Sequence, residues 1–138
     1  MLLVRAQKGP SEIHGLGLIA QQFIPVGTTV WMFQPGFDLM IPDRLMLNLS
    51  ETAREQVAHY AFYDVPARCW VLSSDDDRLT KHSDAPNTSE GPDGYSSVAT
   101  RDIRPGEEIT WNYGKDWRGG GRFDPATRGN AIIEEGTR

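Results

Sequence analysis

The stretch between residues 78 and 114 constrains the fold more than any other part of the chain. It begins as a polar loop and continues as an alternating segment over residues 95–100, a pattern typical of a strand. A Pro-Gly turn at Pro105 and Gly106 separates this segment from a last short strand-like stretch over residues 107–111. The pattern therefore predicts two short strands joined by a tight turn.

Fourteen glycines and nine prolines in 138 residues indicate short elements that are joined by many turns. Further strands are expected over residues 2–6, 16–20, 28–33 and 69–73. A helix is predicted over about residues 51–61, where Thr52 and Glu55 fit a capping box and Ser50 is a competing cap. A weaker helical turn is expected near residues 43–48.

Length and charge narrow the class of protein. A chain of 138 residues corresponds to one domain. The net charge of −5 argues against direct nucleic-acid binding and suits a basic peptide partner, although an acidic surface also keeps proteins in solution. No apolar run approaches membrane-spanning length, so we expect no membrane contact and a cytoplasmic location. The single cysteine, Cys69, leaves no cysteine-rich zinc site, and no metal is expected.

Two motifs and one glycine loop resemble the SET-domain family of protein-lysine methyltransferases. LTKHSDAPN at residues 79–87 is similar to the family motif NHSCxPN, and EEITWNYG at residues 107–114 is similar to ELTxDYG. HGLGL at residues 14–18 resembles the glycine-bearing opening of the same domain. The resemblance implies a mainly β, β-clip-like fold of several small sheets, with a pseudoknot crossing and a short helical insert.

The resemblance covers about residues 13–31 and 75–114 and implies a SET domain over residues 1–114. Within it, residues 34–74 or so correspond to the variable insert of the family. Residues 115–138 correspond to a C-terminal tail like a post-SET segment, and three successive glycines predict a tail that is mobile or that docks conditionally. The chain looks like the compact bacterial or viral members without a zinc segment. Viral members pair as dimers, so the resemblance leaves open whether this chain forms a homodimer.

The resemblance implies S-adenosylmethionine as cofactor. The cofactor-binding residues that it implies are His14, Gly15, Leu16, Gly17, Lys81, His82 and Tyr113. In the family, the motif histidine acts mainly through its backbone, and the downstream asparagine, which is Asn87 in this sequence, ties the loop to the crossing. Lys81 stands where the family usually has Asn, and Asp84 stands where many members have a zinc-binding Cys.

Tyr113 falls on the catalytic tyrosine of the family, and Trp111 falls at a site that governs how many methyl groups fit. The bulk of tryptophan at this position favours mono-methylation. Trp117 and Phe123 are expected to join Trp111 as walls of the substrate channel, because aromatic faces attract an alkylammonium cation.

Methyl transfer from a sulfonium to lysine needs a neutral amine. A free lysine has a pKa of about 10.4, so its neutralisation at pH 7 costs about 4–5 kcal/mol, which an apolar channel reduces. Deprotonation through water needs no dedicated base. The leading hypothesis is a protein-lysine methyltransferase that acts on a basic tail. The alternatives are a non-catalytic SET-fold protein-binding module with weak or no cofactor binding, which Lys81 favours, and a methyltransferase for a small amine or another nucleophile.

Overall fold

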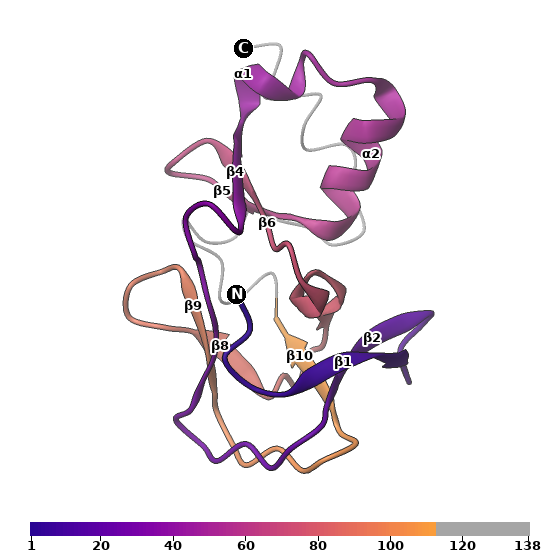
Figure 1. Cartoon of the computed structure of the whole chain (residues 1–138), viewed down its shortest axis with the longest axis vertical. Helices are drawn as coiled ribbons and strands as arrows, with labels where there is room; N and C mark the ends of the chain where they lie inside the picture. Colours follow the sequence, from indigo (N-terminus) through magenta and orange to yellow (C-terminus); the bar gives the residue numbers. More distant parts are fainter. Residues whose placement is uncertain (113–138) are drawn as a thin grey trace.

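In a computed structural model of the protein, three small β-sheets and a few short helices make up a mainly β fold (Figure 1). The structure describes residues 1–112. The expectation of several small sheets with a short helical insert is confirmed. No helix within this part of the chain is long and apolar enough to span a membrane.

The first sheet contains four strands in the order β1-β2-β10-β7. Their bounds are Ala6–Pro10 for β1, Leu16–Ala20 for β2, Glu108–Trp111 for β10 and Lys81–His82 for β7. Strands β1 and β2 form an antiparallel hairpin, β10 runs antiparallel to β2, and β10 runs parallel to β7. The last strand of the described chain is therefore inserted between two strands that precede it.

The other two sheets have three strands each, in the orders β3-β9-β8 and β4-β6-β5. Their bounds are Thr29–Met32 (β3), Ser96–Ala99 (β9), Thr88–Glu90 (β8), Leu39–Pro42 (β4), Cys69–Leu72 (β6) and Phe62–Asp64 (β5). All of these pairs are antiparallel. Figure 1 shows the β4-β6-β5 sheet at the upper end of the molecule and the other sheets at the lower end.

Three short helical segments complete the fold: α1 (Asp43–Met46), α2 (Glu51–Tyr60) and the 3-10 helix η1 (Asp76–Leu79). The predicted helix over residues 51–61 is confirmed to within one residue. Its cap is Ser50, whose Oγ accepts a hydrogen bond from the Ala53 amide at 3.2 Å. The capping box at Thr52 is wrong, because Thr52 already lies inside the first helical turn.

The expected strand over residues 2–6 is also wrong in position, because the paired strand begins only at Ala6. Leu2 forms a single bridge with Trp31, and the Arg5 amide donates to the Gln22 side chain instead of to a neighbouring strand. Leu2, Val4 and Ala6 of this segment still pack on the core between the two lower sheets.

Two main apolar cores divide the molecule. One lies between the lower sheets, and its buried members are Leu18, Ala20, Ile24, Val30, Ala99, Ile103 and Ile109. The other lies under the insert, and its buried members are Met46, Ala58, Ala61, Tyr63 and Trp70. A smaller cluster of Trp31, Cys69 and Val71 connects the two regions, since it joins β3 to β6.

Candidate active site

The glycine loop before β2 is held by the carboxylate of Glu108 on β10. Glu108 accepts hydrogen bonds from the Ser11 hydroxyl at 2.9 Å and from the Glu12 amide at 3.1 Å. A Cβ atom at Gly17 would lie 2.8 Å from Glu108 Oε2, so glycine permits this close approach. Gly15 adopts a φ of 57°, which ordinary residues rarely tolerate. The two glycines thus serve different purposes, one in the turn and one in packing.

Asn87 fastens the polar loop to β10 and is 1% exposed. Its side-chain amide donates to the Glu108 carbonyl at 2.8 Å, and its side-chain oxygen accepts from the Thr110 amide at 2.8 Å. The neighbouring Thr88 hydroxyl donates to the Thr110 carbonyl at 2.7 Å. Ser83 adds a backbone bond to the Trp111 carbonyl at 2.8 Å. These bonds join residues 83–88 to β10, which lies beside β7. We call the unit formed by residues 81–88 and 108–111 the crossing.

A polar groove lies on one side of the crossing and has a volume of about 400 Å³. It is lined by Pro10, Glu12, Ile13, Ile19, Ser83, Ala85, Asn87, Arg101, Gly106, Glu107, Glu108 and Thr110. An ion pair between Arg101 and Glu107, 3.0 Å long, lies in its wall. The hydrogen bond and charge of Arg101 lower the pKa of Glu107, so this carboxyl stays ionised at neutral pH.

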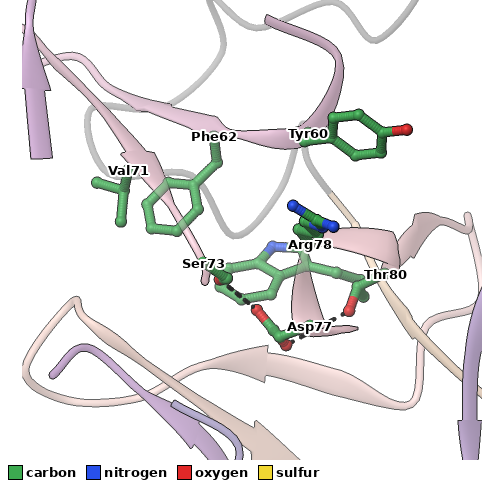
Figure 2. A pocket seen from close by; sticks show the side chains of 8 residues that line it. Tyr60, Phe62, Val71, Ser73, Asp77, Arg78 and Thr80 are labelled. Carbon is green, nitrogen blue, oxygen red and sulfur yellow. Dashed lines mark hydrogen bonds between the residues drawn. The ribbon is translucent and has the colours of Figure 1, made fainter. Parts of the chain in front are cut away.

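A second, smaller pocket of about 20 Å³ is lined by Trp111 and by residues of the insert and η1 (Figure 2). Its walls are Tyr60, Phe62, Val71, Ser73, Asp77, Arg78, Thr80 and Trp111. The rings of Phe62 and Trp111 stack with centroids 6.1 Å apart, and the Arg78 guanidinium lies 5.4 Å from the Tyr60 ring centroid. We call this the aromatic pocket. A space of this volume accommodates one water-sized group.

The two cavities share the strand β10. Glu108 and Thr110 line the groove, whereas Trp111 lines the aromatic pocket. Successive side chains of a strand point to opposite faces, which explains why neighbouring residues reach different cavities. The preceding loop is divided in the same way, with Thr80 in the aromatic pocket and Ser83 in the groove.

The family model of the SET domain matches residues 15–114. The chain belongs to the SET-domain family. No curated protein matches the chain in a sequence search.

Solved structures of two other proteins share this SET fold. A chain of a humanized mutant of the Chaetomium thermophilum Polycomb Repressive Complex 2 matches with a TM-score of 0.61 and 20% identity over 83% of this chain. A candidate histone methyltransferase of Plasmodium falciparum matches with a TM-score of 0.59 and 18% identity, over 84% of this chain and 98% of its own. The match with this protein spans only 15% of the length of the Polycomb chain.

Among the described residues, those predicted from the family motifs to bind the cofactor lie in or next to strands of the first sheet. His14, Gly15 and Leu16 are exposed at the end of the β1–β2 hairpin, beside Ile13 of the groove wall. On the other side of β10, Lys81 pairs with Thr110 and His82 pairs with Trp111. None of these five residues lines either cavity, but their neighbours in sequence Ile13 and Ser83 line the groove.

His82 Nε2 lies 3.1 Å from Asp84 Oδ1, so the residue that replaces the family cysteine contacts the motif histidine. Within residues 1–112, no group of three or more His, Cys, Asp or Glu side chains is arranged to hold a metal ion. Tyr113, Trp117 and Phe123 lie outside the described residues, and their assignments stay predictions. Of the three residues predicted to line a substrate channel, Trp111 is the one that the structure describes, and it lines the aromatic pocket.

Several side chains of the two cavities were not predicted from the sequence. Glu108 organises the glycine loop, and its signal was present in the motif EEITWNYG as the residue before Ile109. Tyr60 lies at the end of the predicted helix, and Phe62 follows it in a stretch without a recognisable motif, yet both line the aromatic pocket. Asp77 follows two other aspartates, a run that resembles an ordinary solvated turn. Only the fold brings this carboxyl beside an aromatic wall.

Proposed function

We propose that this SET-domain protein is an S-adenosylmethionine-dependent methyltransferase that transfers a methyl group to a lysine side-chain amine of a protein. The SET family and a structural relative named as a candidate histone methyltransferase support the reaction class. The observation that carries the proposal is the position of the groove and the aromatic pocket on two sides of one crossing. In-line transfer requires a donor and an acceptor that approach from opposite directions.

The groove fits the methyl donor. Its volume of about 400 Å³ lies within the range of small-molecule sites. Ile13 and Ile19 offer apolar surface, Glu12 offers a carboxylate to a cationic group, and Arg101 offers a guanidinium to a carboxylate. When bound, S-adenosylmethionine supplies an activated methyl group on a sulfonium. The residues that we propose from the motifs to bind this donor are those of the glycine loop and of the Lys81–His82 strand.

The aromatic pocket fits the acceptor. Rings of Tyr60, Phe62 and Trp111 form walls that attract a cation through their π faces. The volume of about 20 Å³ admits little more than the amine itself. We therefore propose mono-methylation as the main outcome, with the bulk of Trp111 as its cause.

A basic protein tail is the proposed substrate, because the chain carries a net charge of −5. We propose the cytoplasm as the location. We also propose that the protein pairs as a homodimer, which the measured mass in solution tests.

The direct test is calorimetric titration with S-adenosylmethionine, followed by transfer of a radiolabelled methyl group to core histones. We expect saturable binding and label on lysine. Tyr113→Phe should reduce turnover far more than donor affinity. Tyr63→Phe, which removes a phenol that donates to Asp43 in the insert, is the matched control and should retain turnover. Absence of donor binding would instead favour the non-catalytic binding module.

A further inference from the structure

We propose that Asp77 accepts the proton that a substrate ammonium loses in the aromatic pocket. The inference rests on the proposed methyl transfer and adds to it a general base that belongs to this chain. The sequence alone suggested deprotonation through water, without a dedicated base.

Asp77 lines the pocket together with the aromatic residues that attract a cation. Figure 2 shows its carboxylate on the opposite side of the pocket from Phe62 and Tyr60. One carboxylate oxygen accepts from the Ser73 hydroxyl at 2.9 Å, and the other accepts from the Thr80 hydroxyl at 3.4 Å. A carboxylate has about four acceptor positions, so two hydroxyl donors leave room for a further one.

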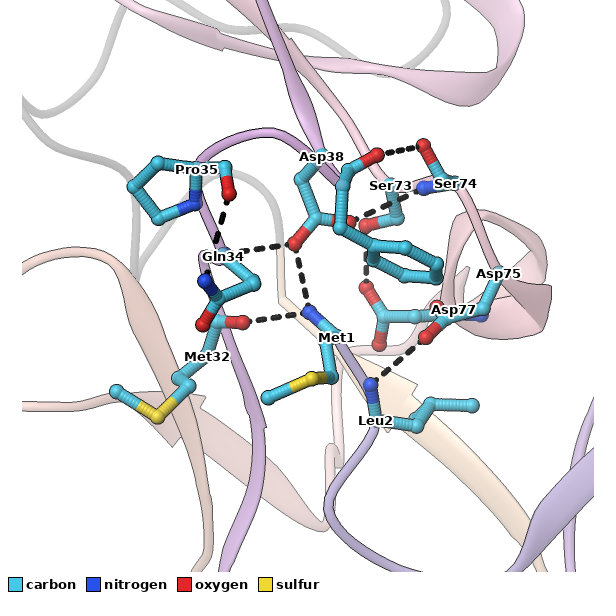
Figure 3. Close-up of polar contacts among 11 residues, drawn as sticks. Met1, Leu2, Met32, Gln34, Pro35, Asp38, Ser73, Ser74, Asp75 and Asp77 are labelled. Carbon is cyan, nitrogen blue, oxygen red and sulfur yellow. Dashed lines mark hydrogen bonds and ion pairs between the residues drawn. The ribbon is translucent and has the colours of Figure 1, made fainter.

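The other acids of this region are committed to the backbone (Figure 3). Asp38 accepts from the Gln34 and Ser74 amides and forms an ion pair with the Met1 amine. Asp75 accepts from the Leu2 amide at 2.8 Å and also caps η1. Neither of them lines the aromatic pocket. Asp77 is therefore the carboxyl in this cluster that faces the proposed amine site.

The surroundings of Asp77 favour proton uptake. Burial raises its pKa to about 7; the Asp75 and Asp38 charges add to the rise, whereas the Ser73 hydrogen bond and the Met1 amine oppose it. The guanidinium of Arg78, in the same pocket, lies over the Tyr60 ring. A base with a pKa close to the working pH combines a useful ionised fraction with sufficient basicity.

The proposed step is balanced in protons and electrons. An N–H bond of the lysine ammonium breaks, its proton forms an O–H bond with ionised Asp77, and the electron pair stays on nitrogen. The neutral amine then uses this pair to form the new C–N bond as the donor C–S bond breaks and its electrons remain on sulfur. The product leaves as a methylammonium, and Asp77 releases its proton to water.

The kinetic test compares pH profiles of kcat/KM for methyl transfer to core histones. In the natural protein, kcat/KM should increase as the pH is raised towards 7 and should be constant between about pH 7.5 and 9.5. In that range the base is ionised while the substrate lysine is still an ammonium. Asp77→Asn should lower kcat/KM about 100-fold at pH 7.5 and should give a tenfold rise per pH unit over the same range. A variant profile parallel to that of the natural protein would overturn the proposal.

Ser73→Ala distinguishes a base from a merely structural carboxylate. Loss of the Ser73 hydrogen bond should raise the pKa of Asp77 and move the acidic limb of the profile to higher pH. An unmoved limb would contradict the assigned role. Asp76→Asn is the matched control, because Asp76 accepts from the Lys8 amide and does not line the pocket. This control should retain the natural profile.

A second measurement does not depend on turnover. Carbon NMR of labelled aspartate carboxyls should give Asp77 a midpoint of about 7, which n-butylamine, a mimic of the lysine side chain, should lower by about 0.5. An unchanged midpoint would overturn the amine contact.

If n-butylamine moves the midpoint but no methyl transfer occurs, the amine site stands and the proposed function fails. If transfer occurs and Asp77→Asn keeps the natural profile, only the base is wrong.

Discussion

The crossing and the insert form the two sides of the candidate site by different means. At the crossing, buried polar side chains such as Asn87 and Thr88 bond directly to the backbone of β10. In the insert, Trp70 and Tyr63 pack with ring centroids 5.1 Å apart over an apolar core. Hydrogen bonds therefore fix the first region, whereas the burial of large rings fixes the second.

The difference has a functional consequence. The groove is lined by the crossing, the β1–β2 hairpin and the segment before β10, and no residue of the insert lines it. The aromatic pocket needs both the crossing, through Trp111, and the insert, through Tyr60 and Phe62. Damage to the insert should impair the acceptor side first. Damage to the crossing should impair both sides together.

Trp70→Ala should have the largest effect on stability. Trp70 is fully buried under the insert, so its truncation should lower the free energy of unfolding by about 4 kcal/mol. Urea unfolding followed by circular dichroism measures this loss. Calorimetry under folding conditions should still show donor binding, because Trp70 does not line the groove.

Trp70→Phe is the control for this experiment. It retains most of the apolar volume, and the Trp70 indole N–H has no hydrogen-bond partner among the described residues. The cost should therefore stay at about 1–2 kcal/mol. Equal losses in the two variants would show that burial of the ring is not what holds the insert.

Asn87→Ala should cost somewhat less stability and more function. It leaves the buried Glu108 carbonyl and Thr110 amide without their side-chain partner, at about 3 kcal/mol for the two groups together. Donor binding by calorimetry and methyl transfer should both be lost. Asn48→Ala, at an exposed site between α1 and α2, should change stability by less than about 0.5 kcal/mol. Retention of donor binding in Asn87→Ala would break the proposed link between the crossing and the groove.

Gly17→Ala should have the smallest of these effects, about 1 kcal/mol, because the new Cβ pushes against the Glu108 carboxylate. The displaced carboxylate should release the glycine loop and weaken donor binding. The double variant with Glu108→Ala removes the obstacle, so the two stability losses should not add. Strict additivity in urea unfolding would exclude this contact as the reason for glycine.

Much of the crossing was predictable from the sequence, because the family motifs at residues 79–87 and 107–114 contain its residues. The strands over residues 16–20 and 107–111 match β2 and β10 almost residue for residue. The helix start at residue 51 was predicted correctly, but the sequence left two hydroxyl residues, Ser50 and Thr52, as candidate caps, and the cap is Ser50. The N-terminal strand was displaced because Arg5 bonds to a side chain of a distant segment.

The candidate site was less predictable where it depends on contacts between distant segments. No local pattern reveals that Asp77 shares a pocket with Tyr60 and Trp111, because these residues come from three separate elements. The family motifs indicated the glycine loop and the Lys81–His82 segment, and they contain Glu108, but they did not indicate that its carboxylate binds the loop to β10. Glu108 acts through tertiary hydrogen bonds, which a strand pattern does not encode.

The position of β10 has a consequence for synthesis of the protein. Its partners β2 and β7 leave the ribosome earlier, and each exposes an unpaired edge until residues 108–111 follow. Non-local pairing of this kind forms slowly, and unpaired strand edges form hydrogen bonds with the edges of other nascent chains. A chain that stops before residue 108 should therefore be prone to aggregation, and the capacity to bind a methyl donor should arise only near the end of translation.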